Sequence, residues 1–233
     1  MNLWRQRLGA VPEAVWERTD LEVLVLADND LTELSPAIGR LRRLRMLDLG
    51  HNRLAAVPGG LGPLLDVLYL HDNQLAELPP ELGKLTRLRY LNAGENRLTG
   101  LPASLGGLAD LVELHLQHNR LAHLPPELGR LGRLRELRLR GNALSALPAS
   151  FAELRDLRHL DLRENAFAEV PAALAGLPLL RSLDLRGNRL TGLPGWLAEL
   201  PALERLDLRW NDALTVGPEV RAALEARGCI LWD

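Results

Sequence analysis

Residues 180–190 read Leu-Arg-Ser-Leu-Asp-Leu-Arg-Gly-Asn-Arg-Leu, and the rest of the chain repeats this pattern. Its skeleton, LxxLxLxxNxL, begins at nine leucines: Leu21, Leu44, Leu65, Leu88, Leu111, Leu134, Leu157, Leu180 and Leu203. Consecutive asparagines of the skeleton are 23 residues apart, except for the 21 residues between Asn52 and Asn73. A fixed period in this range predicts a solenoid, in which each repeat forms one layer stacked on the next.

Composition agrees with such a stack and excludes several classes of function. Leucine supplies 59 of 233 residues, which suits many similar core layers, and the net charge of −2 provides no basic field for nucleic acid. The first residues, MNLWRQR, lack the apolar run of a signal peptide, and no apolar stretch has the length of a membrane span. The single cysteine, Cys229, has no partner for an internal disulfide. We therefore expect a cytoplasmic protein that binds neither nucleic acid nor membranes.

Each repeat is expected to contain a strand whose side chains alternate between two faces, as in Val23-Leu24-Val25-Leu26-Ala27. The two leucines point into the core. The other three positions, here Val23, Val25 and Ala27, point outward, and we call them leading, middle and trailing. The asparagine that follows suits the turn after the strand, where its side chain should pair with buried backbone groups.

The segment after each asparagine reads Leu-x-x-Leu-Pro and continues as a short helical piece, Pro-x-x-Leu-Gly-x-Leu in the early repeats. From Phe151 onward alanine replaces this glycine, at Ala152, Ala175 and Ala198. Alanine favours helix over glycine by up to about 1 kcal/mol per position. The second half is therefore predicted to be more regularly α-helical. The repeat that ends at Leu65 is two residues short, which predicts a shortened helical segment there.

The complete unit, LPxxLGxLxxLxxLxLxxNxL, resembles the leucine-rich repeat family, and in particular its Ras-group intracellular and bacterial members. The resemblance spans essentially the whole chain. It implies an α/β fold: a curved horseshoe with a parallel β-sheet on the concave face and short helices and turns on the convex face. It also implies a non-catalytic scaffold that binds a partner protein through the concave face, in that group often a small GTPase or signalling protein. No residue here matches a GTPase-contact motif, so that partner is an analogy.

The chain is predicted to form one domain of residues 1–233, with a partial capping repeat at 1–20, nine repeat strands within 21–211, and a capping helix and strand at 212–233. Counting one period outward predicts further strands at 1–4 and 229–232, eleven in all. Trp4 and Trp232 would shield the end layers, and Cys229 would fill a core position. We expect a monomer. The variable positions of the repeat are rich in Ala, Arg and Gly, which is typical of a GC-rich bacterial genome.

Outward positions of repeats two to five carry the first residues predicted to bind a partner: Met46, Tyr69, His71, Tyr90, Asn92 and His115. Tyrosine and methionine are enriched in interface cores, and Gly94 would leave a dimple among them. The alternative is that tyrosine simply suits an exposed strand. His71 and His115 lie two strands apart, about 10 Å, whereas the ligands of one zinc ion each lie about 2 Å from it. No metal or cofactor is therefore expected.

A second candidate site is the trailing column of arginines in the later repeats: Arg140, Arg163, Arg186 and Arg209. The middle column beside it carries three aspartates: Asp161, Asp184 and Asp207. Each aspartate can pair with the arginine of its own or the next strand, which predicts a lateral ladder of ion pairs. Alternatively, the column docks an acidic partner or binds a small or phosphorylated ligand. An effector delivered into a host cell is a further possibility.

Residues suited to nucleophilic catalysis also occur on neighbouring strands. Ser182 and His159 occupy leading positions, and Asp161 lies two residues after His159. An open sheet offers no oxyanion hole or enclosing pocket, and the chain has no Gly-rich phosphate loop, CxxC or HExxH motif. The sequence therefore predicts that the protein is not an enzyme.

Overall fold

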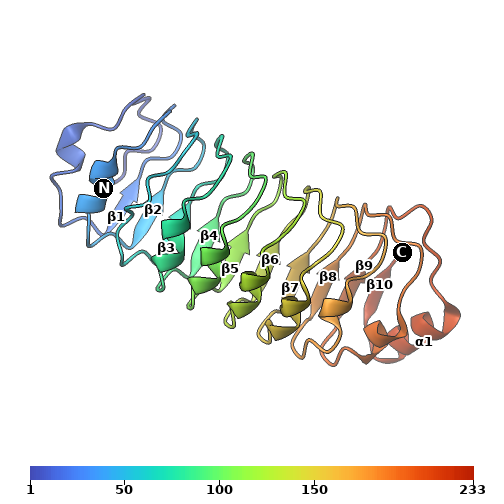
Figure 1. Ribbon diagram of the computed structural model, residues 1–233. Coiled ribbons are helices and arrows are strands. Elements are labelled where there is room, and N and C mark those ends of the chain that lie inside the picture. The colour runs from blue at the N-terminus through green and yellow to red at the C-terminus, as the bar shows by residue number, and fades with distance from the viewer.

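A computed structural model describes residues 1–233 as an elongated stack of repeats with the chain ends at opposite extremes (Figure 1). All strands form one parallel sheet, in which each strand pairs with its neighbours in sequence. The strands are β1 (Val23–Val25), β2 (Met46–Asp48), β3 (Val67–Tyr69), β4 (Tyr90–Asn92), β5 (Glu113–His115), β6 (Glu136–Arg138), β7 (His159–Asp161), β8 (Ser182–Asp184), β9 (Arg205–Asp207) and β10 (Ile230–Trp232). The predicted leucine-rich repeat solenoid is thus confirmed.

The opposite side of the stack carries single turns of 3₁₀ helix and one α-helix. The 3₁₀ helices are η1 (Glu13–Val15), η2 (Pro36–Arg40), η3 (Pro80–Lys84), η4 (Ala103–Gly107), η5 (Pro126–Arg130), η6 (Ala149–Glu153), η7 (Ala172–Leu174) and η8 (Gly195–Glu199), and the α-helix is α1 (Pro218–Ala226). No helix lies between β2 and β3, so the predicted shortening of that repeat is confirmed.

The prediction of more regular α-helix in the second half is wrong. The segments stay 3₁₀ after alanine replaces glycine: in η6, the Leu154 N–H donates to the Phe151 carbonyl at 3.1 Å, three residues earlier. A segment of five residues is too short for α-helical propensity to act. The early glycines serve close packing instead, because a Cβ at Gly83 or Gly106 would overlap backbone atoms of the next repeat.

Leucines of the strands fill the core, as predicted. Leu24 and Leu26 are fully buried, the corresponding leucines from β2 to β9 are buried, and the buried apolar side chains form a single cluster that runs from Val15 to Cys229. Phe151 and Phe167 replace leucine in two layers and are also fully buried. The core is therefore continuous from one end of the stack to the other.

The asparagines form a ladder along the core. The Nδ2 of Asn119 donates to the carbonyls of Leu116 and of Ala93 in the preceding repeat, both at 3.0 Å. Its Oδ1 accepts the Leu98 N–H at 2.9 Å. All nine asparagines donate in this way to a carbonyl three residues earlier and to one in the preceding repeat or end segment. The structural role predicted for them is confirmed.

Replacing Asn119 with alanine should lower the free energy of unfolding by about 1–3 kcal/mol, because it leaves buried backbone groups of two repeats without partners. Chemical denaturation measures the change. Arg120→Ala, at the exposed neighbouring position, is the matched control and should change little. Equal midpoints for the Asn119→Ala variant and wild type would contradict a structural role for the ladder.

The N-terminal end differs in part from its prediction. Residues 1–4 form no full strand, but Asn2 bridges Val25 in the predicted register, and the Leu3 N–H donates to the Val25 carbonyl at 2.9 Å. The Oδ1 of Asn2 accepts the Trp4 N–H at 2.9 Å, and Arg5 has a positive φ like Asp28 one period later, so this segment ends in the same turn as the other repeats. Trp4 is 51% exposed, whereas Trp16 is completely buried. The end layer is therefore closed by Trp16, not by Trp4.

At the C-terminal end, a strand forms as predicted but in a different register. One period after Leu206 lies Cys229, yet Leu231 is the residue that pairs with Leu206 in β9. Helix α1 is longer than the segments it replaces, and the extra residues shift β10 by two positions. Trp232 consequently lies opposite Asp207, in the middle column, and remains partly exposed. Cys229 is buried, as predicted, and burial raises the pKa of its thiol.

Candidate functional site

Five rings form a continuous row across the concave face, from the turn after β2 to β5. We call this row the aromatic chain; it consists of His51, His71, Tyr69, Tyr90 and His115. Consecutive ring centroids lie 4.7, 5.9, 5.0 and 5.0 Å apart, within the range of aromatic pairs. The structure thus brings together four of the predicted residues and adds His51, which belongs to a turn.

The remaining members of the predicted patch have other local roles. Met46 lies on β2, in register with Val67 on β3, and is half-buried. The Oδ1 of Asn92 accepts the Gly94 N–H at 3.1 Å, so part of this amide is used within its own turn. The expected dimple at Gly94 is filled, because the Gln117 side chain lies where a Cβ would be, 2.5 Å away.

Glycine has a second role at the start of the aromatic chain. A Cβ at Gly50 would overlap the His71 imidazole, so the absence of a side chain leaves room for this ring against the preceding turn. There the His71 Nε2 is 3.2 Å from the Nε2 of His51, whose Nδ1 contacts the Asp72 carboxylate at 2.7 Å. Burial, and then the proximity of His51, lowers the pKa of His71.

The other end of the chain is a buried histidine. His115 is only 5% exposed, and its Nδ1 lies 3.1 Å from the Tyr90 hydroxyl. Its Nε2 faces the carboxylates of Glu113 and Glu136, at 3.7 and 3.5 Å. Burial, together with the nearby positive charge of Arg138, lowers the pKa of His115 to about 4. These two effects outweigh the Glu136 carboxylate, which by itself would raise the pKa. The ring is therefore neutral at pH 7.

Sequence reasoning missed Glu113 and Glu136 as site residues. A signal was present, because the two glutamates occupy leading positions on adjacent strands and are paired in register. His115 is the middle residue of the same repeat as Glu113. The alternation of faces therefore placed all three residues on one side of the sheet. It did not predict that their side chains point toward one another.

The stability of the protein should depend on pH through His115. An unfolded chain binds this proton near pH 6.5 and the folded chain near pH 4, so the stabilisation is complete above about 6.5 and is lost as the pH falls toward 4. The full effect is on the order of 3 kcal/mol. Urea denaturation across this range, in a metal-free buffer, measures it. A His115→Gln variant should lose this part of the pH dependence; an unchanged pH profile would contradict the prediction.

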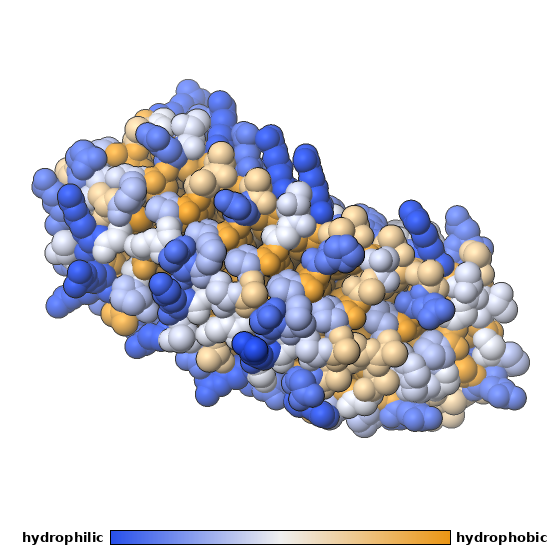
Figure 2. Space-filling model, viewed as in Figure 1, coloured by the Kyte–Doolittle hydropathy of each residue, from blue (hydrophilic) through white to orange (hydrophobic).

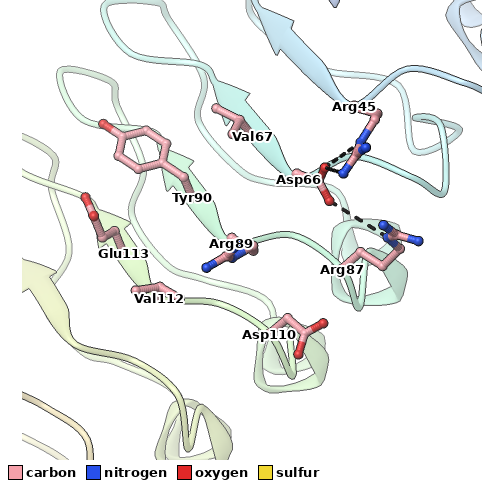
Figure 3. A pocket seen from close by; sticks show the side chains of 9 residues that line it. All are labelled: Arg45, Asp66, Val67, Arg87, Arg89, Tyr90, Asp110, Val112 and Glu113. Atoms are coloured by element: carbon pink, nitrogen blue, oxygen red, sulfur yellow. Dashed lines mark hydrogen bonds and ion pairs between the residues drawn. The ribbon is translucent and has the colours of Figure 1, made fainter. Parts of the chain in front are cut away.

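A pocket of ≈590 Å³ lies beside the aromatic chain, at the edge where the strands begin (Figure 3). Its lining is formed by Arg45, Asp66, Val67, Arg87, Arg89, Tyr90, Asp110, Val112 and Glu113. Arg45 and Arg87 contact the Asp66 carboxylate at 2.5 and 3.8 Å. Arg89 is exposed and forms no ion pair, so its guanidinium is available to an acidic group. Sequence reasoning placed Arg89 beside the outward face of β4 but did not predict that it binds a partner.

The arginine column forms the predicted ladder of ion pairs. Arg163 contacts Asp161 at 2.6 Å and Asp184 at 3.4 Å. Arg186 repeats this with Asp184 at 2.7 Å and Asp207 at 3.3 Å, and Arg209 contacts Asp207 at 2.6 Å.

Arg140 differs from the other three and contacts Glu164 at 2.7 Å. The positive charge of the whole column is therefore largely neutralised by its own neighbours. Arg89, which forms no ion pair, is therefore more available to a partner than the arginines of the column.

The residues considered for catalysis are not connected. His159 and Ser182 pair in register on β7 and β8, but no hydrogen bond joins their side chains. The Asp161 carboxylate accepts hydrogen bonds from the Arg163 guanidinium at 2.6 and 2.9 Å. The three residues thus form no proton relay, and Asp161 belongs to the ladder.

The surface around these features is mixed in character. In Figure 2, hydrophilic side chains project along the margins of the stack, and hydrophobic residues are visible between them in narrow bands. The most exposed aromatic side chain is Trp210, which is 65% exposed in the turn after β9, with the Arg186 guanidinium over its ring at 5.4 Å.

Comparison with known proteins agrees with this architecture. The profile of the leucine rich repeat family matches residues 1–54, 63–121, 110–167 and 170–212. The chain belongs to the leucine-rich repeat family, whose members are typically non-catalytic binding domains. Among curated proteins, none matches the sequence. No helix of the structure combines the length and the apolar character needed to cross a membrane.

Solved structures of similar proteins come from bacteria and plants. A leucine-rich repeat protein of Leptospira interrogans is 31% identical with a TM-score of 0.88, over 97% of this chain and 64% of that one. The ectodomain of the receptor kinase GASSHO1/SCHENGEN3 of Arabidopsis thaliana is also 31% identical, with a TM-score of 0.81, over 96% of this chain and 28% of that one. An internalin of Listeria monocytogenes shares the fold at 21% identity and a TM-score of 0.72, over 96% of this chain and 70% of that one. The chain thus spans less than two thirds of the first two proteins.

Proposed function

We propose that this protein is a non-catalytic binding domain that holds a protein or peptide segment on its concave face, with Tyr69 and Tyr90 at the centre of the contact. The observation that carries the proposal is the aromatic chain beside the pocket that contains the unpaired Arg89. Both tyrosines are half-buried on paired strands, with ring centroids 5.0 Å apart. Tyrosine supplies a large contact area at a low cost in conformational entropy, which is why it is frequent among the residues that dominate binding.

Rigidity of the sheet supports the same function. Both tyrosine rings lie on strands of a continuous parallel sheet and contact each other, so little ordering is needed when a partner binds. The unpaired Arg89 favours a segment that carries an acidic group next to an apolar or aromatic one. Charge-assisted pairing with a carboxylate would set the orientation of the segment.

Two similar proteins were solved with a bound partner. The GASSHO1/SCHENGEN3 ectodomain was solved in complex with CASPARIAN STRIP INTEGRITY FACTOR 2. The plant peptide hormone receptor RGFR1, which is 26% identical to this chain with a TM-score of 0.70, was solved in complex with RGF2. These complexes support a protein or peptide as the partner. We further propose that residues 1–233 act as one domain and as a monomer in a bacterial cytoplasm, on a signalling protein.

A receptor for a small or phosphorylated ligand on the arginine column is the alternative function. The column has the residue type that binds phosphate. Its guanidinium groups, however, already contact carboxylates of the same repeats. A ligand would have to displace these contacts, so we favour the aromatic chain.

Footprinting with hydroxyl radicals tests the proposal. Peptides are first selected on the purified protein from a random library, and side-chain oxidation is then mapped with and without the tightest one. Binding should protect Met46, Tyr69 and Tyr90, while the exposed Trp4 is oxidised equally in both samples and serves as the internal control. Protection confined to the turns of the convex face would contradict the proposal, and protection confined to the arginine column would favour the alternative.

A further inference from the structure

Three groups of metal-ligating type converge at the end of the aromatic chain. They are the carboxylates of Glu113 and Glu136 and the imidazole of His115, whose nearest ligand atoms all lie within 4.8 Å of one another. Strands β5 and β6 position them, since Glu113 and Glu136 are paired in register and His115 points out of the same face two residues after Glu113. The cluster is thus a product of neighbouring repeats in a rigid sheet.

The Nε2 atom of His115 is the second observation. This side chain is more than nine-tenths buried, and its Nε2 has no hydrogen-bond partner. The two carboxylates lie 3.5 and 3.7 Å away, beyond hydrogen-bond distance for a nitrogen donor. Buried polar atoms are rarely left unpaired without a reason. A cation between this nitrogen and the carboxylates would satisfy all three groups.

We propose that Glu113, His115 and Glu136 form a binding site for a divalent transition-metal ion, with Zn²⁺ as the preferred ion. Around tetrahedral zinc with bonds of about 2.0–2.2 Å, neighbouring ligand atoms lie about 3.4 Å apart. The observed 3.5 and 3.7 Å therefore require only small adjustments. The imidazole disfavours Ca²⁺ and Mg²⁺, which prefer oxygen ligands. Three protein ligands leave one position open toward the concave face, for water or for a group of a bound partner.

Tyr90 completes the site from behind. Its hydroxyl lies 3.1 Å from the Nδ1 of His115, so Nδ1–H can donate to it and leave the Nε2 lone pair directed at the carboxylates. Metal-binding histidines are commonly oriented in this way by a hydrogen bond from their other nitrogen. Tyr90→Phe removes the acceptor and should weaken metal binding about tenfold, without removing any ligand.

Arg138 opposes the metal. Its Nε contacts the Glu136 carboxylate at 2.5 Å, where it competes for the ligand oxygen and places a positive charge beside the site. Arg138→Gln should therefore strengthen Zn²⁺ binding, by up to about tenfold. A gain in affinity on removal of a surface ion pair is not expected from a merely structural role of this cluster.

Titration of the metal-free full-length chain with Zn²⁺ alone, followed by calorimetry, tests the site, and the absorption spectrum of the Co²⁺ form reports its geometry. Glu113→Gln and Glu136→Gln preserve side-chain shape and should each weaken binding at least about tenfold. His115→Gln should do the same. If that variant fails to fold, as judged by circular dichroism, the two glutamine variants at the half-buried glutamates carry the test.

His71→Gln is the matched control, because it removes a histidine of the aromatic chain that lies outside the proposed site. The Nε2 of His71 is 3.2 Å from that of His51. It should leave Zn²⁺ affinity unchanged. A wild-type chain that takes up no Zn²⁺ overturns the proposal. So does unchanged affinity in both glutamine variants, or a loss of affinity in His71→Gln alone. Because Zn²⁺ is the only ligand added, the outcome is independent of whether a peptide binds the concave face.

Discussion

Replacing Tyr69 and Tyr90 by alanine should weaken the binding of library-selected peptides at least about thirtyfold, which corresponds to about 2 kcal/mol. The two rings contact each other and occupy the middle of the aromatic chain, so the double variant removes contact area from the centre of the proposed interface. Charged residues at a rim contribute much less to affinity. Fluorescence anisotropy of a labelled peptide measures the dissociation constants.

The double variant should remain folded, because neither tyrosine belongs to the buried core. Loss of the ring contacts should cost folding stability only about 0.5–1.5 kcal/mol per aromatic pair. Tyr69→Phe with Tyr90→Phe is the matched control: it keeps both rings and should retain most of the affinity. Arg43→Ala, on the far side of the repeat, controls for nonspecific effects. Full affinity of the folded double-alanine variant for every selected peptide would place the binding site elsewhere.

The Trp16→Ala variant should lose about 3–5 kcal/mol of unfolding free energy, among the largest stability changes expected for this chain. Trp16 is completely buried beside Val15, in the layer that ends the stack. In a solenoid each repeat is stabilised by its neighbours, so an end layer that loses its cap frays first. Chemical denaturation measures the loss, and hydrogen exchange should localise it to the amides of β1.

Two variants separate burial from other causes. The indole Nε1 of Trp16 has no hydrogen-bond partner. Trp16→Phe therefore removes buried apolar area but no hydrogen bond, and it should retain most of the stability. Trp4→Ala removes a tryptophan that is 51% exposed and should have little effect. If Trp4→Ala were as destabilising as Trp16→Ala, the cap would be the one expected from sequence counting after all.

By itself, the sequence determined every feature that follows from the repeat period. In a solenoid, residues one period apart are neighbours in space, so the period alone aligns Leu24 with Leu47 and stacks Asn96 on Asn119. The same counting places Asp184 beside Arg163 and Arg186. It also places four members of the aromatic chain, all except His51, on the same face of the sheet. These features depend on backbone register, and register is fixed because each layer must bury its leucines.

Tertiary structure alone decided what happens where the period fails or where side-chain direction matters. Helix α1 is longer than a repeat segment and moves β10 by two residues, which no counting could show. Trp16 closes the N-terminal layer, whereas Trp4 stays exposed to solvent. The carboxylates of Glu113 and Glu136 meet the Nε2 of His115 because of their side-chain conformations, beside a ring that contacts the Tyr90 hydroxyl. Alternation of faces is a property of the backbone, whereas such convergence depends on the rotamers that packing selects.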